Sequence, residues 1–207
     1  MQTVFVRPER CIGCRQCEFA CAVEHSHSRT PSGAAWEEPR PKPRIHVDPG
    51  PWLNSSFPSK CRHCDPAPCE AACLTGALQR DTEHDLVLIE ESKCIACATC
   101  AMVCAFDAVT FHRHGNGHLP AVTAIKCDGC IDRLQHSRAP ACVEACKTGA
   151  LVFGEINDLI AADRERQSAA SLRAVQPVSP DNVAAWRGWG RAATAVAEGV
   201  SHGNKSF

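Results

Sequence analysis

The arrangement of its sixteen cysteines constrains this chain more than any other feature. They form four quartets with none left over, and each quartet starts with Cys-x2-Cys and ends with a cysteine four residues after the third. The quartets are Cys11, Cys14, Cys17, Cys21; Cys61, Cys64, Cys69, Cys73; Cys94, Cys97, Cys100, Cys104; and Cys127, Cys130, Cys142, Cys146. Only 5% of the 207 residues are aromatic and tyrosine is absent, so a conventional core has little material. We expect something bound to the cysteines to organise the fold.

The spacing within the quartets predicts iron–sulfur clusters. The first and third quartets match the C-x2-C-x2-C-x3-C run of bacterial ferredoxins, and the second and fourth only lengthen its middle gap. A cube-shaped [4Fe–4S] cluster needs four thiolates. A tight loop can reach three of its corners, while a cysteine one helical turn further on faces a second cluster. Four quartets therefore predict four [4Fe–4S] clusters in two pairs, with all sixteen cysteines as ligands.

Zinc and disulfides are the alternatives for so many cysteines. Zinc sites usually join two C-x2-C knuckles across a longer gap, which the second and fourth quartets alone would allow. The first and third quartets pack four cysteines into eleven residues and do not suit zinc. Disulfide frameworks belong to exported chains, and the N-terminus has no basic segment followed by an apolar stretch. A zinc-organised interaction module stays as the alternative function.

An internal repeat indicates duplication. Cys61, Cys94 and Cys127 are spaced 33 residues apart, and each follows a lysine, while Arg10 precedes Cys11. A cation at these positions would favour an anionic cluster, although a solvated lysine remains an equally good interpretation of each. The sequences after Cys73 and Cys146 also repeat as x-Thr-Gly-Ala-Leu, which predicts equivalent turns at Gly76 and Gly149.

The pattern between the cysteines predicts an α+β fold: two nested, pseudo-duplicated ferredoxin-like dicluster units with an insertion loop and a C-terminal helical extension. Short strands are expected at Val4–Val6, Arg44–Val47, Leu86–Ile89, Val109–Phe111, Ala121–Ile125 and Leu151–Phe153. The four-cluster domain is expected to span residues 1–154. Residues 22–43, with four prolines, are expected to form the insertion loop, and 112–120 a connection between strands.

Residues 155–207 hold no cysteine and are expected to be helical. One helix is predicted from Ile156 to about Leu172, and a second from Ser179-Pro180, where serine can cap the helix and proline suits its first position. The second helix has an apolar side that includes Trp186 and Trp189. Either a partner or the chain's own domain would cover that side.

The stretch from Arg10 to about Gly154 resembles the four-cluster ferredoxin-like subunits of redox complexes. Such subunits include the small subunits of dimethyl sulfoxide reductase, formate dehydrogenase and tungsten aldehyde oxidoreductase, and the ferredoxin associated with CO dehydrogenase. The match lies in the four quartets and in the fourth-quartet signature C-D-G-C-I-D-R … P-A-C-V-E-A-C-K-T-G-A. The proline that usually follows the fourth cysteine is missing from all four quartets, which leaves turn geometry and potentials there open.

The resemblance implies that the first quartet pairs with the fourth and the second with the third. The ligand sets would be Cys11, Cys14, Cys17, Cys146; Cys127, Cys130, Cys142, Cys21; Cys61, Cys64, Cys69, Cys104; and Cys94, Cys97, Cys100, Cys73. The four clusters would then form a line. His63, inside the second loop, could donate a hydrogen bond to a sulfide, and we expect none of the ten histidines to be a ligand.

These features predict an electron-transfer subunit that is not an enzyme on its own. The sequence has no dinucleotide fingerprint, P-loop or HExxH motif. The expected partners are a catalytic redox subunit and a further electron carrier or a flavin or NAD subunit, and self-assembly is possible. A tungsten or molybdenum aldehyde oxidoreductase ranks first, then CO dehydrogenase, hydrogenase or formate dehydrogenase. A net charge of -1 gives no reason to expect nucleic-acid binding, and the absence of a long apolar run predicts a cytoplasmic chain.

Overall fold

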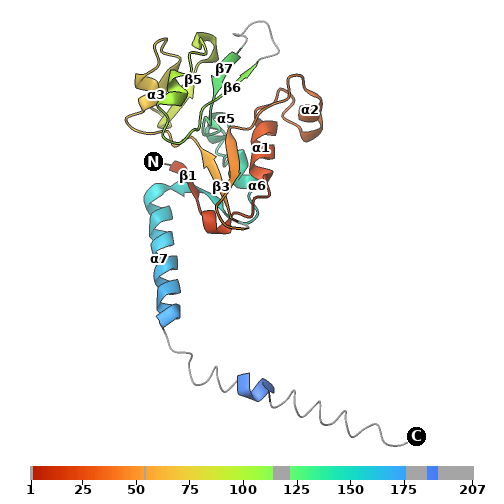
Figure 1. Ribbon diagram of the computed structural model, residues 1–207, viewed down its shortest axis with the longest axis vertical. Helices are drawn as coiled ribbons and strands as arrows, with labels where there is room; N and C mark the ends of the chain where they lie inside the picture. The colour runs from red at the N-terminus through yellow and green to blue at the C-terminus, as the bar shows by residue number, and fades with distance from the viewer. Residues whose placement is uncertain (1, 54, 114–121, 176–185, 191–207) are drawn as a thin grey trace, which may run out of the picture. The chain divides into compact units, whose positions relative to one another are not determined.

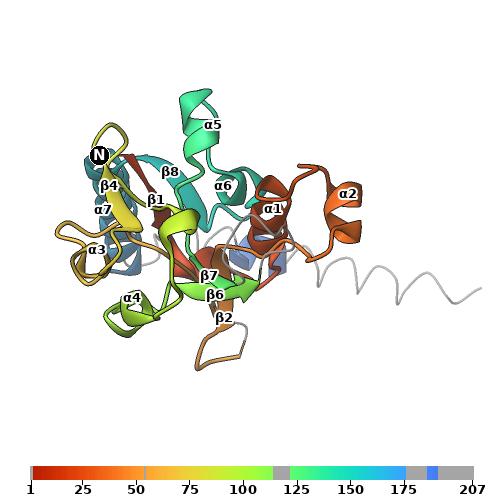
Figure 2. The same cartoon turned by 90° about the horizontal axis from the view of Figure 1, so that it is seen from above.

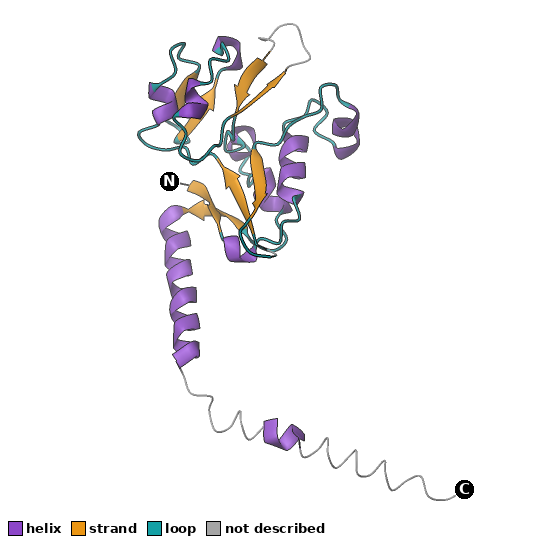
Figure 3. Cartoon of the chain, in the orientation of Figure 1, coloured by secondary structure: helices purple, strands orange, loops and turns teal. Residues whose placement is uncertain are grey.

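The computed structural model describes residues 2–53, 55–113, 122–175 and 186–190. The chain divides into two compact units, Met1–Leu159 and Ile160–Phe207. In the described part of the first unit, short helices alternate with eight strands that form four antiparallel pairs (Figures 1 and 3). The first unit contains all sixteen cysteines.

Three of the strand pairs join strands that follow each other in the sequence, and one joins the two ends of the unit. The pairs of consecutive strands are β2 (Ile45–Pro49) with β3 (Ser56–Lys60), β4 (Leu78–Asp81) with β5 (Leu86–Ile89), and β6 (Thr110–Arg113) with β7 (Val122–Ile125). The fourth pair is β1 (Gln2–Val6) with β8 (Leu151–Glu155). Because Val4 lies opposite Phe153, the start of the chain is tied to the segment after the fourth quartet.

The order of strands and quartets occurs twice along the first unit. From β1 the chain runs through the first quartet, the hairpin β2–β3 and the second quartet to β4. From β5 it runs through the third quartet, the hairpin β6–β7 and the fourth quartet to β8. Hydrogen bonds match as well: the Arg7 N–H donates to the Ala150 carbonyl at 2.7 Å, and the Glu90 N–H donates to the Ala77 carbonyl at 2.7 Å.

Short helices carry the third cysteine of each quartet. Cys17 lies in α1 (Gln16–Glu24), Cys69 in α3 (Pro68–Ala71), Cys100 in α4 (Thr99–Met102) and Cys142 in α6 (Ala141–Ala145). The remaining helices are α2 (Pro31–Trp36), α5 (Ile131–Gln135) and α7 (Ile156–Val175), and 3-10 turns at Pro8–Arg10 and Glu91–Lys93 precede the first and third quartets. Figure 2 shows α3 and α4 at one side of this unit and α1, α2 and α6 at the other.

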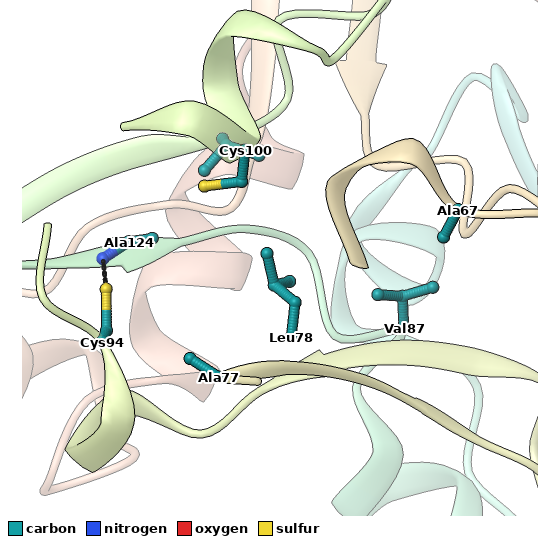
Figure 4. Close-up of a cluster of buried hydrophobic side chains, with 8 residues drawn as sticks. Ala67, Ala77, Leu78, Val87, Cys94, Cys100 and Ala124 are labelled. Carbon is teal, nitrogen blue, oxygen red and sulfur yellow. Dashed lines mark hydrogen bonds between the residues drawn. The ribbon is translucent and has the colours of Figure 1, made fainter. Parts of the chain in front are cut away.

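The buried residues form two clusters, one for each pair of quartets. One contains Leu78, Val87, Cys94 and Cys100 (Figure 4). Cys69, Cys73 and Cys104 pack against it. The other contains Cys17, Cys21, Ile45, Val47, Cys142 and Leu151, with Cys11 and Cys146 packed against it. The largest fully buried side chains are Ile45, Val87, Thr123, Pro58 and Pro140, so the described core contains no fully buried aromatic side chain.

The strands expected from the sequence are present within a few residues, but β3 and β4 were not predicted. Both have polar or proline-containing sequences, and Pro58 is tolerated because β3 pairs on one edge only. Residues 22–43 are not a loop throughout. Helix α1 continues to Glu24, and α2 starts after Thr30, whose side chain accepts a hydrogen bond from the Gly33 N–H at 3.2 Å.

The C-terminal segment is described in part. Helix α7 extends three residues beyond the predicted Leu172, to Val175. Most of the predicted helix from Ser179 lies outside the described residues, although residues 186–190 are helical. Of the predicted connection 112–120, His112 and Arg113 belong to β6 instead, and the rest lies outside the described residues. None of the helices in the described ranges has the length and apolar character needed to cross a membrane.

Candidate metal centres

Seven of the sixteen cysteines are buried, seven are half-buried and two are exposed. Cys14 and Cys97, the second cysteines of the first and third quartets, are exposed. The corresponding Cys64 and Cys130, in the second and fourth quartets, are half-buried and buried. The buried cysteines are Cys17, Cys21, Cys61, Cys94, Cys100, Cys130 and Cys142.

The four cysteine loops share one backbone feature. The residue two positions after the first cysteine has a left-handed conformation in every loop, with φ values of 70° at Gly13, 50° at His63, 55° at Ala96 and 71° at Gly129. Such a turn directs successive N–H groups into the concave side of a loop, where they can bind an anion. In two loops this same residue donates its N–H to the first sulfur, from His63 to Cys61 and from Gly129 to Cys127, both at 3.4 Å.

Neighbouring segments supply further N–H donors to sulfur. Arg44 donates to Cys21 at 3.2 Å, Ala124 donates to Cys94 at 3.4 Å (Figure 4), and Leu151 donates to Cys146 at 3.4 Å. The turns after Cys73 and Cys146 also match: Gly76 and Gly149 have φ values of 65° and 68°, as the repeat predicted. N–H groups aimed at thiolates stabilise the anionic form and tune the potential of a bound cluster.

The first and fourth quartets approach each other through α1 and α6. Burial raises the pKa of Cys17 to about 11, and among the nearby charges that of Cys146 raises it too. Burial raises the pKa of Cys21 still further, and the charges of Cys127 and Cys130 raise it too. The hydrogen bond from the Arg44 N–H has the opposite effect and lowers this pKa. The sulfur of Cys17 therefore lies near the fourth quartet's last cysteine, and that of Cys21 lies near its first two.

The second and third quartets approach each other in the same way through α3 and α4. Burial raises the pKa of Cys69, and the charges of Cys61 and Cys104 contribute to the rise. The side-chain hydroxyl and backbone N–H of Thr99 lower the pKa of Cys97, whereas the charge of Cys73 raises it. The last cysteine of each of these two quartets therefore lies near cysteines of the other quartet.

The donor chemistry of these centres fits a metal cluster. Buried thiols with raised pKa values remain protonated at neutral pH unless a metal binds them, and coordination removes the proton. A cavity lined by Cys21, Cys127, Cys130 and Cys142 also contains His63. The Val87 N–H donates to His63 Nδ1 at 3.0 Å, so Nε2 carries the ring proton, yet it is buried without a partner in the described residues. A sulfide or thiolate would satisfy it.

A second polar group around Asp128 was not foreseen from the sequence. Its carboxylate accepts hydrogen bonds from the Arg44 guanidinium at 2.6 Å and, at 3.1 Å, from His25 Nε2. Burial raises the pKa of Asp128, but His25, Arg44 and the Cys130 N–H outweigh it and hold that pKa well below its ordinary range. Although His25, Asp128 and Cys130 have ligand atoms within 4.8 Å of one another, the guanidinium on Asp128 makes this an ion-pair cluster that fastens residues 25–44 to the fourth loop.

Comparison with known proteins agrees with this geometry. The family model of the 4Fe–4S dicluster domain matches residues 53–156. One subunit of the anaerobic dimethyl sulfoxide reductase of Escherichia coli (strain K12) is 32% identical over 186 residues, which covers 84% of this chain and 80% of that protein.

Two further relatives are similar over most of their length. An iron-sulfur protein of Rhodospirillum rubrum is 36% identical over 173 residues, covering 80% of this chain and 88% of the relative. The electron transport protein HydN of Escherichia coli (strain K12) is 36% identical over 171 residues, covering 77% of this chain and 93% of the relative. The family is defined by [4Fe–4S] clusters, which decides against zinc. The chain belongs to the 4Fe–4S dicluster domain family, and its cofactors are [4Fe–4S] clusters.

Proposed function

We propose that this chain is an electron-transfer subunit that carries four [4Fe–4S] clusters in a line between a catalytic redox subunit and a second electron carrier. The observation that carries the proposal is that last cysteines lie among cysteines of another quartet. Cys17 and Cys146 pack in one buried cluster, Cys21 lines a cavity with Cys127 and Cys130, and Cys73 lines another cavity with Cys97. The chain does not catalyse a reaction on its own.

Each proposed cluster takes three cysteines from one quartet and the last cysteine of another. The sets are Cys11, Cys14, Cys17, Cys146; Cys127, Cys130, Cys142, Cys21; Cys61, Cys64, Cys69, Cys104; and Cys94, Cys97, Cys100, Cys73. The matching order of strands, hairpins and quartets in the two halves supports the nested duplication that this assignment requires. The predicted four-cluster domain, residues 1–154, and the C-terminal extension, residues 155–207, are kept as part of the proposal.

The order of the line follows from contacts and exposure. His63 of the second loop lines the same cavity as Cys127 and Cys130 of the fourth loop, which supports placing the clusters of these two loops side by side in the middle of the line. The exposed Cys14 and Cys97 mark the two ends, where electrons can enter and leave. Apolar side chains beside them are exposed, including Ile12 and Phe19 near Cys14 and Leu74 and Ile95 near Cys97, and suit docking to partners.

The names of the relatives support a catalytic redox subunit as one partner. One relative is a subunit of dimethyl sulfoxide reductase and another an electron transport protein. The expected preference for a tungsten or molybdenum aldehyde oxidoreductase receives no specific support from these relatives, so we propose only the class of partner. A flavin or NAD subunit or another carrier would dock at the opposite end. A cytoplasmic location is part of the same proposal.

The first test is iron content. Sixteen thiolates in four sets should give about sixteen iron atoms per chain after anaerobic purification. Redox titration followed by EPR should then resolve four clusters. A value near eight iron atoms, with two clusters, would contradict the proposal.

The second test addresses the exchange of cysteines. Cys21→Ser should change the EPR signal that Cys142→Ser also changes, and Cys17→Ser should change a different one, although Cys17 and Cys21 share α1. Serine offers an oxygen ligand, so a shifted potential is expected rather than loss of the cluster. If Cys21→Ser and Cys17→Ser perturb the same cluster, each quartet holds its own cluster and the proposed line is wrong.

A further inference from the structure

The four cations that precede the quartets have two different environments. Lys60 and Lys126, before the second and fourth quartets, are buried, with exposed fractions of 7% and 3%. Lys93, before the third quartet, has a side chain 48% exposed, and its ammonium pairs with Glu90 at 2.6 Å. Arg10, before the first quartet, is also exposed. Buried and exposed cations alternate, so the two buried lysines hold equivalent positions in the two halves.

Neither buried ammonium has a carboxylate partner among the described residues. Lys60 Nζ donates to the Cys61 carbonyl at 3.2 Å, and Lys126 Nζ donates to the carbonyls of Val87 and, at 3.1 Å, Cys127. Asp128, close to Lys126 in sequence, is engaged by Arg44 and His25. A buried charge without a counter-ion is strongly unfavourable, and an anionic thiolate-bound cluster nearby would supply that counter-charge.

Lys60 lies beside the cysteines of the other half of the molecule. It belongs to β3, directly before the second quartet, but it lines the same cavity as Cys21, Cys127, Cys130 and Cys142. Its positive charge therefore acts on the set of sulfurs that follows Lys126 in the sequence.

Lys126 makes the reciprocal connection. It precedes the fourth quartet, but its ammonium reaches the carbonyl of Val87 in β5. Val87 lies in the buried cluster against which Cys69 and Cys104 pack. Each lysine thus faces the sulfurs that follow the other lysine.

We propose that each of these lysines raises the reduction potential of the cluster bound by the loop that follows the other lysine. The clusters of the second and fourth loops are called the inner clusters, and the two lysines a crossed pair. Lys60 would act on the cluster of Cys127, Cys130, Cys142 and Cys21, and Lys126 on that of Cys61, Cys64, Cys69 and Cys104. This inference rests on the proposed function, because it uses those ligand sets. Reduction adds one electron, and hence one negative charge, to a cluster that is already anionic with its four thiolates. A nearby buried ammonium stabilises the reduced form more than the oxidised form.

The arrangement has a consequence for the middle of the line. The inner clusters are neighbours, so an electron on one repels an electron on the other. The two buried cations beside them offset this repulsion, whereas the exposed Lys93 and Arg10 act on the outer clusters through water, where ions screen them. The inner clusters should therefore have higher potentials than the outer clusters.

The test is redox-titrated EPR on Lys60→Met and Lys126→Met, with Lys93→Met as the matched control. The Cys142→Ser and Cys69→Ser variants identify the signals of the two inner clusters. Lys60→Met should lower the potential of the Cys142 cluster more than that of the Cys69 cluster, and Lys126→Met should do the reverse. At the wild-type midpoint the reduced-to-oxidised ratio should fall at least tenfold, which corresponds to about 59 mV for a one-electron couple. Lys93→Met should change neither inner cluster.

Two further measurements separate charge from packing. Lys60→Arg and Lys126→Arg keep the positive charge and should restore most of the lost potential. The shifts in the methionine variants should persist at high salt, because a buried charge is poorly screened. If a methionine variant binds less iron than wild type, Lys60→Gln or Lys126→Gln, which keep a hydrogen-bond donor, take its place.

The outcomes distinguish the inference from the proposed function. The lysine pair is overturned if the methionine variants change the potentials of the inner clusters no more than Lys93→Met does. If the protein then still binds about sixteen iron atoms per chain and gives four EPR signals, the electron-transfer line stays intact. A shift in the cluster of the lysine's own loop alone would overturn the crossing. Fewer than four clusters in the wild-type protein would instead count against the proposed function.

Discussion

At the scale of single residues, all four cysteine loops have a left-handed residue two positions after their first cysteine. Glycine adopts this conformation without strain, whereas His63 and Ala96 adopt it at a cost of roughly 1–2 kcal/mol. In return, the left-handed turn directs N–H groups at the sulfurs. The buried Nε2 of His63 adds a further donor near the place where a cluster would bind.

Gly129 is the position at which this requirement can be tested most sharply. Its φ is +71°, and a Cβ atom there would lie 2.8 Å from Leu86 Cδ1, a side chain that is itself buried. Gly129→Ala should therefore combine backbone strain of roughly 1–2 kcal/mol with overpacking of about 1–3 kcal/mol. We expect a lower thermal midpoint for the iron-loaded protein, measured anaerobically by circular dichroism.

Gly76→Ala is the matched control for that substitution. Gly76 has a φ of +65°, but the nearest atom to an added Cβ is the flexible end of Gln79, at 3.9 Å. Only the backbone strain applies, so the midpoint should fall by less than in Gly129→Ala. Equal losses in the two variants would show that contact with Leu86 does not matter.

At the scale of elements, Arg133 joins three helices around the first and fourth quartets. Extending from α5, it binds Glu24 at the end of α1 at 2.7 Å, Glu144 in α6, and the Ala139 carbonyl at 2.7 Å through Nε. Its side chain is only 7% exposed, so Arg133→Met leaves Glu24 without its buried partner. We expect a loss of about 3 kcal/mol, which should lower the thermal midpoint by roughly 6–12 °C for a chain of this size.

Arg29 provides the control for Arg133. It pairs with Asp132, also in α5, at 2.8 Å, but both side chains are about 60% exposed. Exposed ion pairs contribute about 0–1 kcal/mol, so Arg29→Met should leave the midpoint nearly unchanged. If Arg133→Met behaves like Arg29→Met, the three-helix connection is not important for stability.

The elements also show what the sequence can and cannot predict. The cysteine loops and strands such as β5 (Leu-Val-Leu-Ile) follow from local spacing and β-branched residues, so they were predicted. Strands β3 and β4 form because partners lie opposite them, which their own polar sequences do not reveal. The pairing of Arg44 with Asp128, and of Lys126 with Val87, joins residues 84 and 39 positions apart. Sequence spacing gives no signal for such contacts.

At the scale of the whole molecule, the first unit has too little apolar core to explain its fold. In the described part, its buried hydrophobic residues are mainly alanine and cysteine, the largest fully buried side chains are not aromatic, and every sheet has two strands. A two-stranded sheet is marginally stable by itself. The chain must also bring together cysteines as distant as Cys17 and Cys146, at an entropic cost that nothing in this small core offsets. The clusters are the remaining source of stability.

Removal of iron should therefore unfold the first unit. Without metal, the buried thiols, such as Cys130 with a pKa raised to about 12, are protonated and bind nothing. We expect the chelator-treated, reduced protein to lose its cooperative thermal transition and most of its near-UV circular dichroism, while α7, outside the cysteine loops, retains some far-UV signal. Reconstitution with iron and sulfide should restore both signals, which separates loss of metal from irreversible damage. A metal-free protein that still melts sharply would show that side-chain packing alone holds the four strand pairs together, and that the clusters occupy a preformed scaffold.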